Sequence, residues 1–152
     1  MPRIAFSGGK DPQVVHHFAL EVQGIEAATF REASGFSSSS EVIENREVGA
    51  GGKQFLSKQP GNIKWADLVL KRGVTDSLDL YNWRQLVVDG RIDEARKDGS
   101  IVFYSNDGAE IARFSFVRGW PSEWKGPDVN TTNNDVAVEE ITIAHEGLIR
   151  SS

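Results

Sequence analysis

Three histidines are the side chains best suited to bind a metal ion in this 152-residue chain: His16, His17 and His145. Metal-binding histidines recur in motifs such as His-Glu-x-x-His on a helix, and the sequence contains no such motif. His16 and His17 are neighbours on an expected strand, where successive side chains point to opposite faces, so they cannot both ligate one ion. The sequence therefore predicts no metal site and no cofactor.

Catalytic motifs are not found either. His145 and the many serines supply the residue types of a hydrolase triad, but Gly-x-Ser-x-Gly does not occur. The glycine-rich segment 49–52 precedes Lys53 without the spacing or the following helix of a phosphate-binding loop. Side chains of the adjacent acids at 93–94 and 139–140 diverge, which does not suit paired-carboxylate catalysis. We predict no catalytic residue and no enzyme.

Trp120 and Trp124 flank Pro121 and could stack on a sugar or a nucleotide. Two aromatic residues in a Gly/Pro-rich loop more often cap one end of a β-sandwich, so we expect a structural role for both. A small ligand-binding β-barrel module stays as the alternative interpretation.

Composition excludes several further classes. The absence of cysteine excludes a disulfide scaffold, a thiolate zinc site and an iron–sulfur cluster. No apolar run approaches 18 residues, so no membrane-spanning segment is expected, and the first residues lack the apolar core of a Sec signal peptide. The net charge is −5 and no segment forms a basic patch, so sequence-specific nucleic-acid binding is not expected.

The elements that hold these side chains are mostly strands. Alternation of apolar and polar residues predicts strands over residues 17–23, 28–33, 63–71, 101–104, 111–117 and 136–145. Helical spacing over about residues 76–89 places Leu80, Trp83 and Val87 on one face. The fold class is therefore mainly β: an antiparallel β-sandwich or barrel with one flanking α-helix. We expect residues 1–152 to form a single domain with an irregular N-terminal arm over 1–15.

Local signals predict how these elements begin, turn and end. Thr75, Asp76 or Ser77 can cap the helix, and Gly90 can end it. The remaining signals predict a turn at Pro60-Gly61, a hairpin turn at Asn106-Asp107-Gly108, an aromatic loop over 120–127, a turn at 133–135 and a β-bulge at Glu139-Glu140. The apolar residues expected in the core are Phe18, Leu20, Val22, Leu70, Leu80, Trp83, Val87, Phe114, Phe116 and Trp120.

The segment over about residues 41–56 differs from the other strands. Its β-branched residues alternate, but both faces carry charge, which suits a long projecting hairpin whose surface meets another chain. Gly49-Ala50-Gly51-Gly52 would form the tip because glycine adopts positive φ at no steric cost. The residues expected to contact another subunit are Glu41, Val42, Ile43, Glu44, Arg46, Val48, Gly49, Gly51, Gly52, Lys53 and Phe55.

Seven stretches, in this order and spacing, match a known family. They are Ser34-Gly35-Phe36 leading into Glu41-Val42-Ile43-Glu44-Asn45-Arg46-Glu47, Lys58-Gln59-Pro60-Gly61, Leu68-Val69-Leu70-Lys71-Arg72-Gly73, Leu80-Tyr81-Asn82-Trp83, Gly119-Trp120-Pro121-Ser122-Glu123-Trp124, Asn134-Asp135-Val136-Ala137-Val138-Glu139-Glu140 and His145-Glu146-Gly147-Leu148. The sequence resembles the tail tube proteins of contractile phage tails and of phage-tail-like contractile injection systems.

The resemblance implies a structural protein without catalysis. Six β-sandwich subunits would form a ring, and stacked rings would form a hollow tube inside a contractile sheath that drives it through a target envelope. The implied partners are the sheath protein, the baseplate or tube initiator, the tail terminator, and a cargo of effector protein or DNA in the lumen. In the family the hairpin contacts the neighbouring ring, and the helix lies on the outside of the tube wall.

The resemblance also implies assembly in the cytoplasm, and a place in a phage tail or in an extracellular or cell-associated injection particle. A baseplate-proximal tube initiator is the alternative within the family, and its ring would not stack on copies of itself. A net charge of −5 repeated around a ring predicts a mildly negative channel and no high-affinity binding of DNA.

Overall fold

The computed structural model describes residues 14–23, 25–75, 77–127 and 137–151. Eight strands of this part form one antiparallel sheet in the order β2-β1-β7-β8-β9-β6-β3, with β10 beside β8. Their bounds are β1 His17–Val22, β2 Ile25–Phe30, β3 Glu32–Ser34, β6 Leu68–Gly73, β7 Lys97–Tyr104, β8 Glu110–Lys125, β9 Val138–Ala144 and β10 Gly147–Arg150. The predicted mainly β, antiparallel fold is confirmed.

The sheet curls into a barrel because its two end strands follow each other in the chain. β2 and β3 are separated by Arg31 alone, and the Arg31 backbone N–H donates to the carbonyl oxygen of Lys71 on β6 at 2.8 Å. β8 is long enough to serve both halves: its first part pairs with β7 and β10, and its last part pairs with β9. Arg118, with φ of 50°, lies where β8 changes partners.

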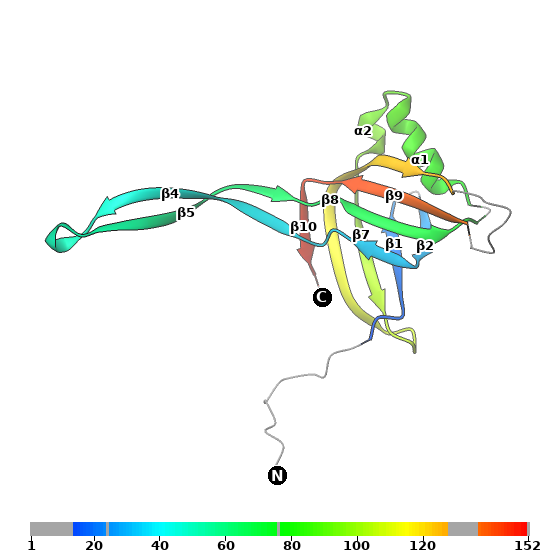
Figure 1. Ribbon diagram of the computed structural model, residues 1–152. Coiled ribbons are helices and arrows are strands. Elements are labelled where there is room, and N and C mark those ends of the chain that lie inside the picture. Colours follow the sequence, from blue (N-terminus) through cyan, green and yellow to red (C-terminus); the bar gives the residue numbers. More distant parts are fainter. Residues whose placement is uncertain (1–13, 24, 76, 128–136, 152) are drawn as a thin grey trace, which may run out of the picture.

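Helix α1 (Asp79–Val88) covers the barrel core, and a short helix α2 (Ile92–Ala95) follows it (Figure 1). Leu80 and Trp83 are buried, and the Trp83 indole N–H donates to the carbonyl oxygen of Ala95 at 2.7 Å. Gly90 has φ of 81°, which suits the residue that ends the helix. The predicted start is about three residues early: α1 begins at Asp79 and Leu78 holds the cap position without a side-chain hydrogen bond. Of the predicted caps, the Ser77 hydroxyl accepts the Asp79 N–H at 3.4 Å. Asp76 lies outside the described residues.

The core joins residues of both halves of the barrel to the helix. Of the residues predicted there, Leu20, Val22, Leu70, Leu80, Trp83 and Phe116 are buried together. Phe18, Val87 and Trp120 pack against that cluster and are partly buried. Phe114 is half-buried and contacts the rings of Phe36 and Phe103, at centroid distances of 4.9 and 5.2 Å, and those two residues pack against the core cluster.

Two predicted turns prove to be strand. The aromatic loop expected over residues 120–127 is largely the last part of β8, where Trp120 pairs with Ala144 and Trp124 with Ile141 on β9. The register shifts just after Pro121, and such an irregularity accommodates a residue without a backbone N–H. Pro60-Gly61 likewise lies inside a strand, β5 (Gln54–Trp65).

The bulge predicted at Glu139-Glu140 is also wrong. β9 pairs with β6 in unbroken register, and Glu139 lies on the buried face together with Ile141 and Ile143. The apparent break in the alternation arises because this buried position holds a carboxylate, which pairs with Arg72 directly across the ladder. The turn predicted at 133–135 lies outside the described residues.

Candidate assembly surfaces

A two-stranded hairpin leaves the barrel and projects far from it (Figure 1). β4 (Ser38–Val48) and β5 form a sheet of their own, with Val48 opposite Gln54 near the tip. A short 3-10 turn over Ala50–Gly52 closes the tip, where Gly51 and Gly52 have φ of 83° and 77°. The hairpin spans residues 38–65 and is therefore longer than the predicted 41–56.

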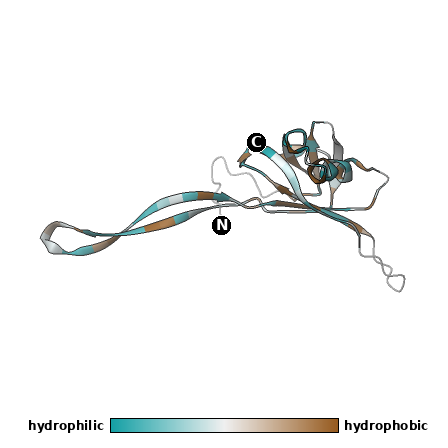
Figure 2. Ribbon diagram, turned by 90° about the horizontal axis from the view of Figure 1, so that it is seen from above, coloured by the Kyte–Doolittle hydropathy of each residue, from teal (hydrophilic) through white to brown (hydrophobic). Residues whose placement is uncertain are grey.

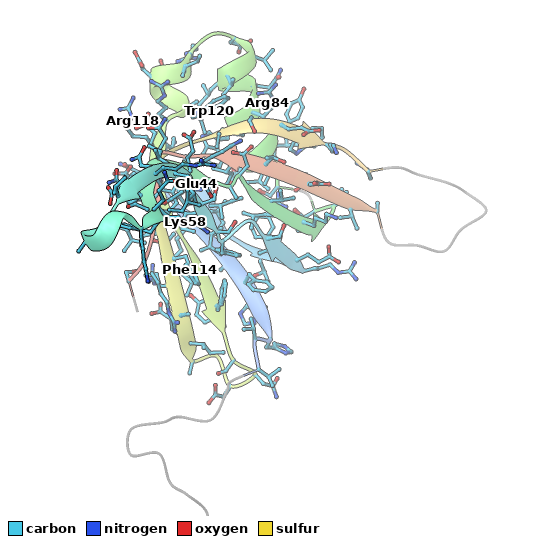
Figure 3. The ribbon with its side chains drawn as sticks, turned by 60° about the vertical axis from the view of Figure 1, so that its left-hand side comes forward. Glu44, Lys58, Arg84, Phe114, Arg118 and Trp120 are labelled. Carbon is cyan, nitrogen blue, oxygen red and sulfur yellow. The ribbon has the colours of Figure 1, made fainter. Side chains whose placement is uncertain are left out.

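Both faces of the hairpin carry exposed apolar side chains between charged ones. One face pairs Val42 with Pro60, Glu44 with Lys58 and Arg46 with Leu56, and the other pairs Ile43 with Gln59 and Glu47 with Phe55. Val42 is 59% exposed and Phe55 50%. Figure 2 shows hydrophobic and hydrophilic residues alternating along the hairpin, and Figure 3 shows Glu44 and Lys58 together on it. An isolated hairpin is at best marginally stable, so these side chains need a surface outside the hairpin to pack on.

The structure places every residue predicted to contact another subunit on this hairpin. Glu41, Val42, Ile43, Glu44, Arg46 and Val48 lie on β4, Gly49, Gly51, Gly52 and Lys53 at the tip, and Phe55 on β5. Sequence reasoning missed the half nearest the barrel, including Ile63, which is 64% exposed. The alternation of Ile63 with Lys64 and Trp65 continues the hairpin, but Pro60-Gly61 was interpreted as its end.

A second exposed apolar stripe follows the helices. Leu78, Tyr81 and Val88 recur at helical spacing along α1, Ile92 follows at the start of α2, and the four side chains are between 38% and 63% exposed. They lie opposite the buried Leu80 and Trp83, with the acidic Asp89 and Asp93 among them. In the sequence, the spacing of Leu78, Tyr81 and Val88 by three and seven residues indicates a second apolar stripe on the helix. Sequence reasoning missed it because the buried stripe alone is enough to predict the helix.

The third surface is the face of β1, β7, β8 and β10 that points away from the core. Arg113 on β8 binds Glu110 and, on β1, Glu21, each at 2.7 Å, and both carboxylates raise the pKa of Arg113. β7 lies between β8 and β1, so the Arg113 side chain crosses β7 beside Val102 to reach Glu21. The Val102 side chain is fully buried.

A row of hydroxyl groups continues that surface. The Ser115 oxygen lies 3.0 Å from that of Ser100 on β7 and 3.2 Å from that of Ser151. We call this surface the serine–arginine face. It carries charged groups of both signs, and the apolar Val117 and Ile149 are exposed on it at 43% and 66%.

Neither catalytic chemistry nor a metal centre is indicated by the described residues. Among them, no three His, Asp or Glu side chains gather in an arrangement that could hold a metal ion. A groove of about 660 Å³ beside α2 is lined by charged side chains such as Asp93, Arg96 and Lys97, and Lys97 is engaged by the carbonyl oxygen of Gln23 at 2.9 Å. Neither helix of this part has the length and apolar composition needed to cross a membrane.

The two tryptophans considered for ligand stacking are used in packing. Trp120 packs against the core, and the Trp124 ring lies edge-on to Tyr81 of α1 at 5.2 Å. Arg84 of α1 donates to the carbonyl oxygen of Pro121 at 3.0 Å, which ties the helix to this part of β8 (Figure 3).

A barrel of one antiparallel sheet with a covering helix and a long hairpin is the fold of a tube-forming tail protein. Residues 14–149 match the family of the T4-like virus tail tube protein gp19, so the chain belongs to this family of structural tube proteins. No curated protein sequence shows significant similarity to the chain.

Solved structures agree with the family. A chain of the sheath–tube complex of the extracellular contractile injection system PVC in its extended state is 25% identical, with a TM-score of 0.75, and the match covers 99% of both chains. A chain of the PVC sheath/tube terminator is 26% identical, with a TM-score of 0.73, covering 94% of this chain and 99% of that one. Hcp1 from Flavobacterium johnsoniae shares the fold at 17% identity and a TM-score of 0.55, covering 90% and 95%.

Proposed function

We propose that this chain is the repeating subunit of the inner tube of a contractile injection system or phage tail. It forms hexameric rings that stack into a hollow tube, and a contractile sheath drives that tube through a target envelope to deliver its cargo. The observation that carries the proposal is the hairpin over residues 38–65. It exposes apolar side chains on both faces, and among the described strands it pairs with none outside itself.

The hairpin is assigned to the contact between neighbouring rings. Val42, Leu56 and Val48 on one face, and Ile43 and Phe55 on the other, are exposed in the single subunit. Fully burying a side chain of this size stabilises by about 1.5–3 kcal/mol, so several such contacts per subunit suffice to hold rings together.

The remaining surfaces fit the two sides of a tube wall. The serine–arginine face and the helices lie on opposite sides of the core, because Trp83 packs with Phe116 on the inner side of the sheet. We assign the serine–arginine face to the channel and the stripe of Leu78, Tyr81 and Val88 to the sheath. Closed cyclic symmetry repeats one head-to-tail contact without unlimited growth, and stacking of the rings is open-ended.

The proposal includes no catalysis, because a tube wall acts by shape and surface. Particles of this kind assemble in the cytoplasm and carry an effector protein or DNA as cargo. The alternative of a baseplate-proximal initiator ring differs in one property: its rings would not stack on copies of themselves.

Negative-stain microscopy of the purified full chain tests the proposal. We expect rings and tubes from the natural sequence, and rings without tubes from the hairpin variant Phe55→Ser/Leu56→Ser. Val88→Ser is the matched control, since Val88 is 61% exposed on α1 and should leave tubes intact in the absence of sheath. Small featureless particles from the natural sequence at high concentration would contradict the proposal, and rings that never stack would favour the initiator.

A further inference from the structure

The hairpin is attached to the barrel through two short links only. Residues 35–37 lead into β4, and residues 66–67 lead from β5 into β6. Because β4 and β5 pair only with each other among the strands that the structure describes, the angle at which the hairpin leaves the barrel depends on the place where these links meet. We call this region, residues 35–37 and 65–67, the hairpin root.

His145, from the link between β9 and β10, binds the hairpin root. Its Nε2 lies 3.0 Å from the carbonyl oxygen of Ala66, and its ring lies 6.1 Å from that of Trp65 and 6.3 Å from that of Phe116. A carbonyl oxygen can only accept, so Nε2 carries the proton and donates it. The other ring nitrogen, Nδ1, is buried and has no hydrogen-bond partner among the described residues, so within this part of the chain the ring acts through Nε2.

The two links also hold each other. The Ala66 backbone N–H donates to the carbonyl oxygen of Ser37 at 3.1 Å, which couples the outgoing and returning chains. Gly35 has φ of 94°, and a Cβ there would lie 1.9 Å from the carbonyl oxygen of Asp67.

Phe36 of the root also packs on the rings of Phe103 and Phe114 at 5.3 and 4.9 Å. The outgoing link is therefore anchored on β7 and β8, and the hydrogen bond of His145 ties the returning link to the end of β9.

The length of the hairpin makes the angle at its root important. β4 has 11 residues, and at about 3.3 Å per residue the hairpin reaches about 36 Å from its root. A rotation of about 10° at the root would move the tip by about 6 Å, which exceeds the spacing between neighbouring strands. Contacts made near the tip therefore tolerate very little freedom at the root.

We propose that His145 is a positioning residue for tube assembly, which sets the angle of the hairpin through its hydrogen bond to Ala66 and its contact with Trp65. The hairpin angle is a property of the single subunit. Its consequence for stacking rests on the proposed function of the hairpin as the contact between rings. His145 thus acts through the hairpin and does not itself touch the neighbouring ring.

Distance measurements between spin labels test the angle directly. The chain has no cysteine, so Lys53→Cys at the tip and Asn82→Cys on α1 provide the only two labelling sites. His145→Phe keeps a ring but removes the hydrogen-bond donor. In dilute, unassembled subunits we expect this variant to broaden the distribution of label-to-label distances by about 6 Å, which is the displacement of the tip for a rotation of about 10° at the root. His145→Gln, whose amide can still donate, should restore most of the natural width.

His17→Phe is the matched control, because His17 also stacks on an aromatic ring, that of Tyr104, but lies on β1 away from the root. It should leave the distribution unchanged. Tube formation is the second readout: we expect His145→Phe to raise the concentration needed for tubes by about tenfold, the scale of one lost hydrogen bond of ordinary strength. His17→Phe should leave that concentration unchanged.

The outcomes separate the two proposals. A distribution that stays narrow in His145→Phe overturns the positioning role, whether or not tubes form. Failure of the natural sequence to form tubes overturns the proposed function and leaves the distance measurement valid. Should His145→Phe fail to fold, ring nitrogen NMR of the natural protein decides: a proton on Nδ1 with Nε2 bare would remove the hydrogen bond on which the inference depends.

Discussion

Arg72 and Glu139 face each other across β6 and β9 and form an ion pair inside the barrel. The two side chains are 6% and 9% exposed, and the Arg72 guanidinium lies over the ring of Phe30 at 5.9 Å. One of the guanidinium nitrogens, Nη2, is buried and finds no hydrogen-bond partner in the part of the chain that the structure describes. A hydrophobic pair of similar volume could therefore fill the same place. Each of the two charged side chains needs the other, because either one alone would be a buried charge without a counter-charge.

Removing one member of this pair should be costly. Glu139→Ala leaves a buried guanidinium without its counter-charge, so we expect a loss of about 3–5 kcal/mol in the free energy of unfolding. The double variant Arg72→Met/Glu139→Leu should recover most of that loss. Denaturant unfolding of the unassembled subunit measures both.

An exposed pair serves as the control. Arg91 and Glu94 are each 57% exposed, so Glu94→Ala should change the free energy of unfolding by less than about 1 kcal/mol. A loss of this small size for Glu139→Ala would show that the buried pair contributes no more than a surface one.

Trp83 should be a major contributor to subunit stability. It is 2% exposed and donates to the carbonyl oxygen of Ala95, so it joins α1, α2 and the barrel. Trp83→Ala should lower the free energy of unfolding by about 3–5 kcal/mol, as large aromatic truncations do. Trp83→Phe, which keeps a ring but leaves the buried carbonyl without its donor, should cost about 1–3 kcal/mol. A loss of a few tenths for Trp83→Ala would mean that Trp83 is not a core residue.

The helix and the main strands could be predicted because their apolar residues repeat at the spacing of the element. Leu80 and Trp83 on one helical face, and Phe18, Leu20 and Val22 on one strand face, are such cases. The glycines and the two charged faces predict the hairpin, but they do not predict its full length. Pro60 lies inside β5, where one edge of each strand has no neighbour and a missing N–H costs little.

Contacts between residues that lie far apart in the sequence could not be predicted from local patterns. Glu139 was interpreted as a sign of a bulge because the residue that neutralises it, Arg72, lies 67 positions earlier. His145 had no role in the sequence, since its partner Ala66 is 79 positions away and contributes only a backbone carbonyl. Pairing of this kind needs the register of the sheet, which local patterns do not determine.

The hairpin should be poorly protected in the single subunit and well protected in the tube. Apart from its root it forms hydrogen bonds within one two-stranded ribbon, which is marginal alone. Hydrogen exchange should therefore be fast over residues 41–56 in dilute subunits and slower by orders of magnitude in tubes, while Leu70 and Ile141 stay protected in both. Equal protection of residues 41–56 in the two states would contradict this prediction.

The turn between β7 and β8 should weaken in acid. The Ser105 hydroxyl and the Ala109 backbone N–H both donate to Asp107 and lower its pKa below the ordinary value of 3.8. A depressed pKa in the folded state means that the stabilisation is present above pH 3.8 and is lost as the pH falls through the lower folded value. In an NMR titration, Ser105→Ala should raise the pKa of Asp107 toward 3.8, while the control Ser77→Ala, which is far from Asp107 in the sequence, leaves it unchanged. An unaltered pKa in Ser105→Ala would remove the hydroxyl as its cause.

The serine–arginine face, if it lines the channel as proposed, should let nucleic acid pass without holding it. Arg113 is engaged by Glu21 and Glu110, so the cation is neutralised within the wall and one negative charge remains among the three. Tubes of the natural sequence should therefore not co-sediment with duplex DNA at physiological salt. Tight binding by these tubes that weakens steeply with salt would contradict the argument.

Reversing the two carboxylates should convert this wall into a binding surface and reveal where it lies. In Glu21→Lys/Glu110→Lys the face carries three cations, so tubes should retain DNA with a strong dependence on salt. That DNA should resist nuclease, because the channel wall encloses it. Asp89→Lys/Asp93→Lys is the matched control on the helices: it adds the same charge to the surface assigned to the sheath, so any DNA that it binds should be digested. Nuclease-sensitive DNA on the Glu21→Lys/Glu110→Lys tubes would place the serine–arginine face on the outside of the tube.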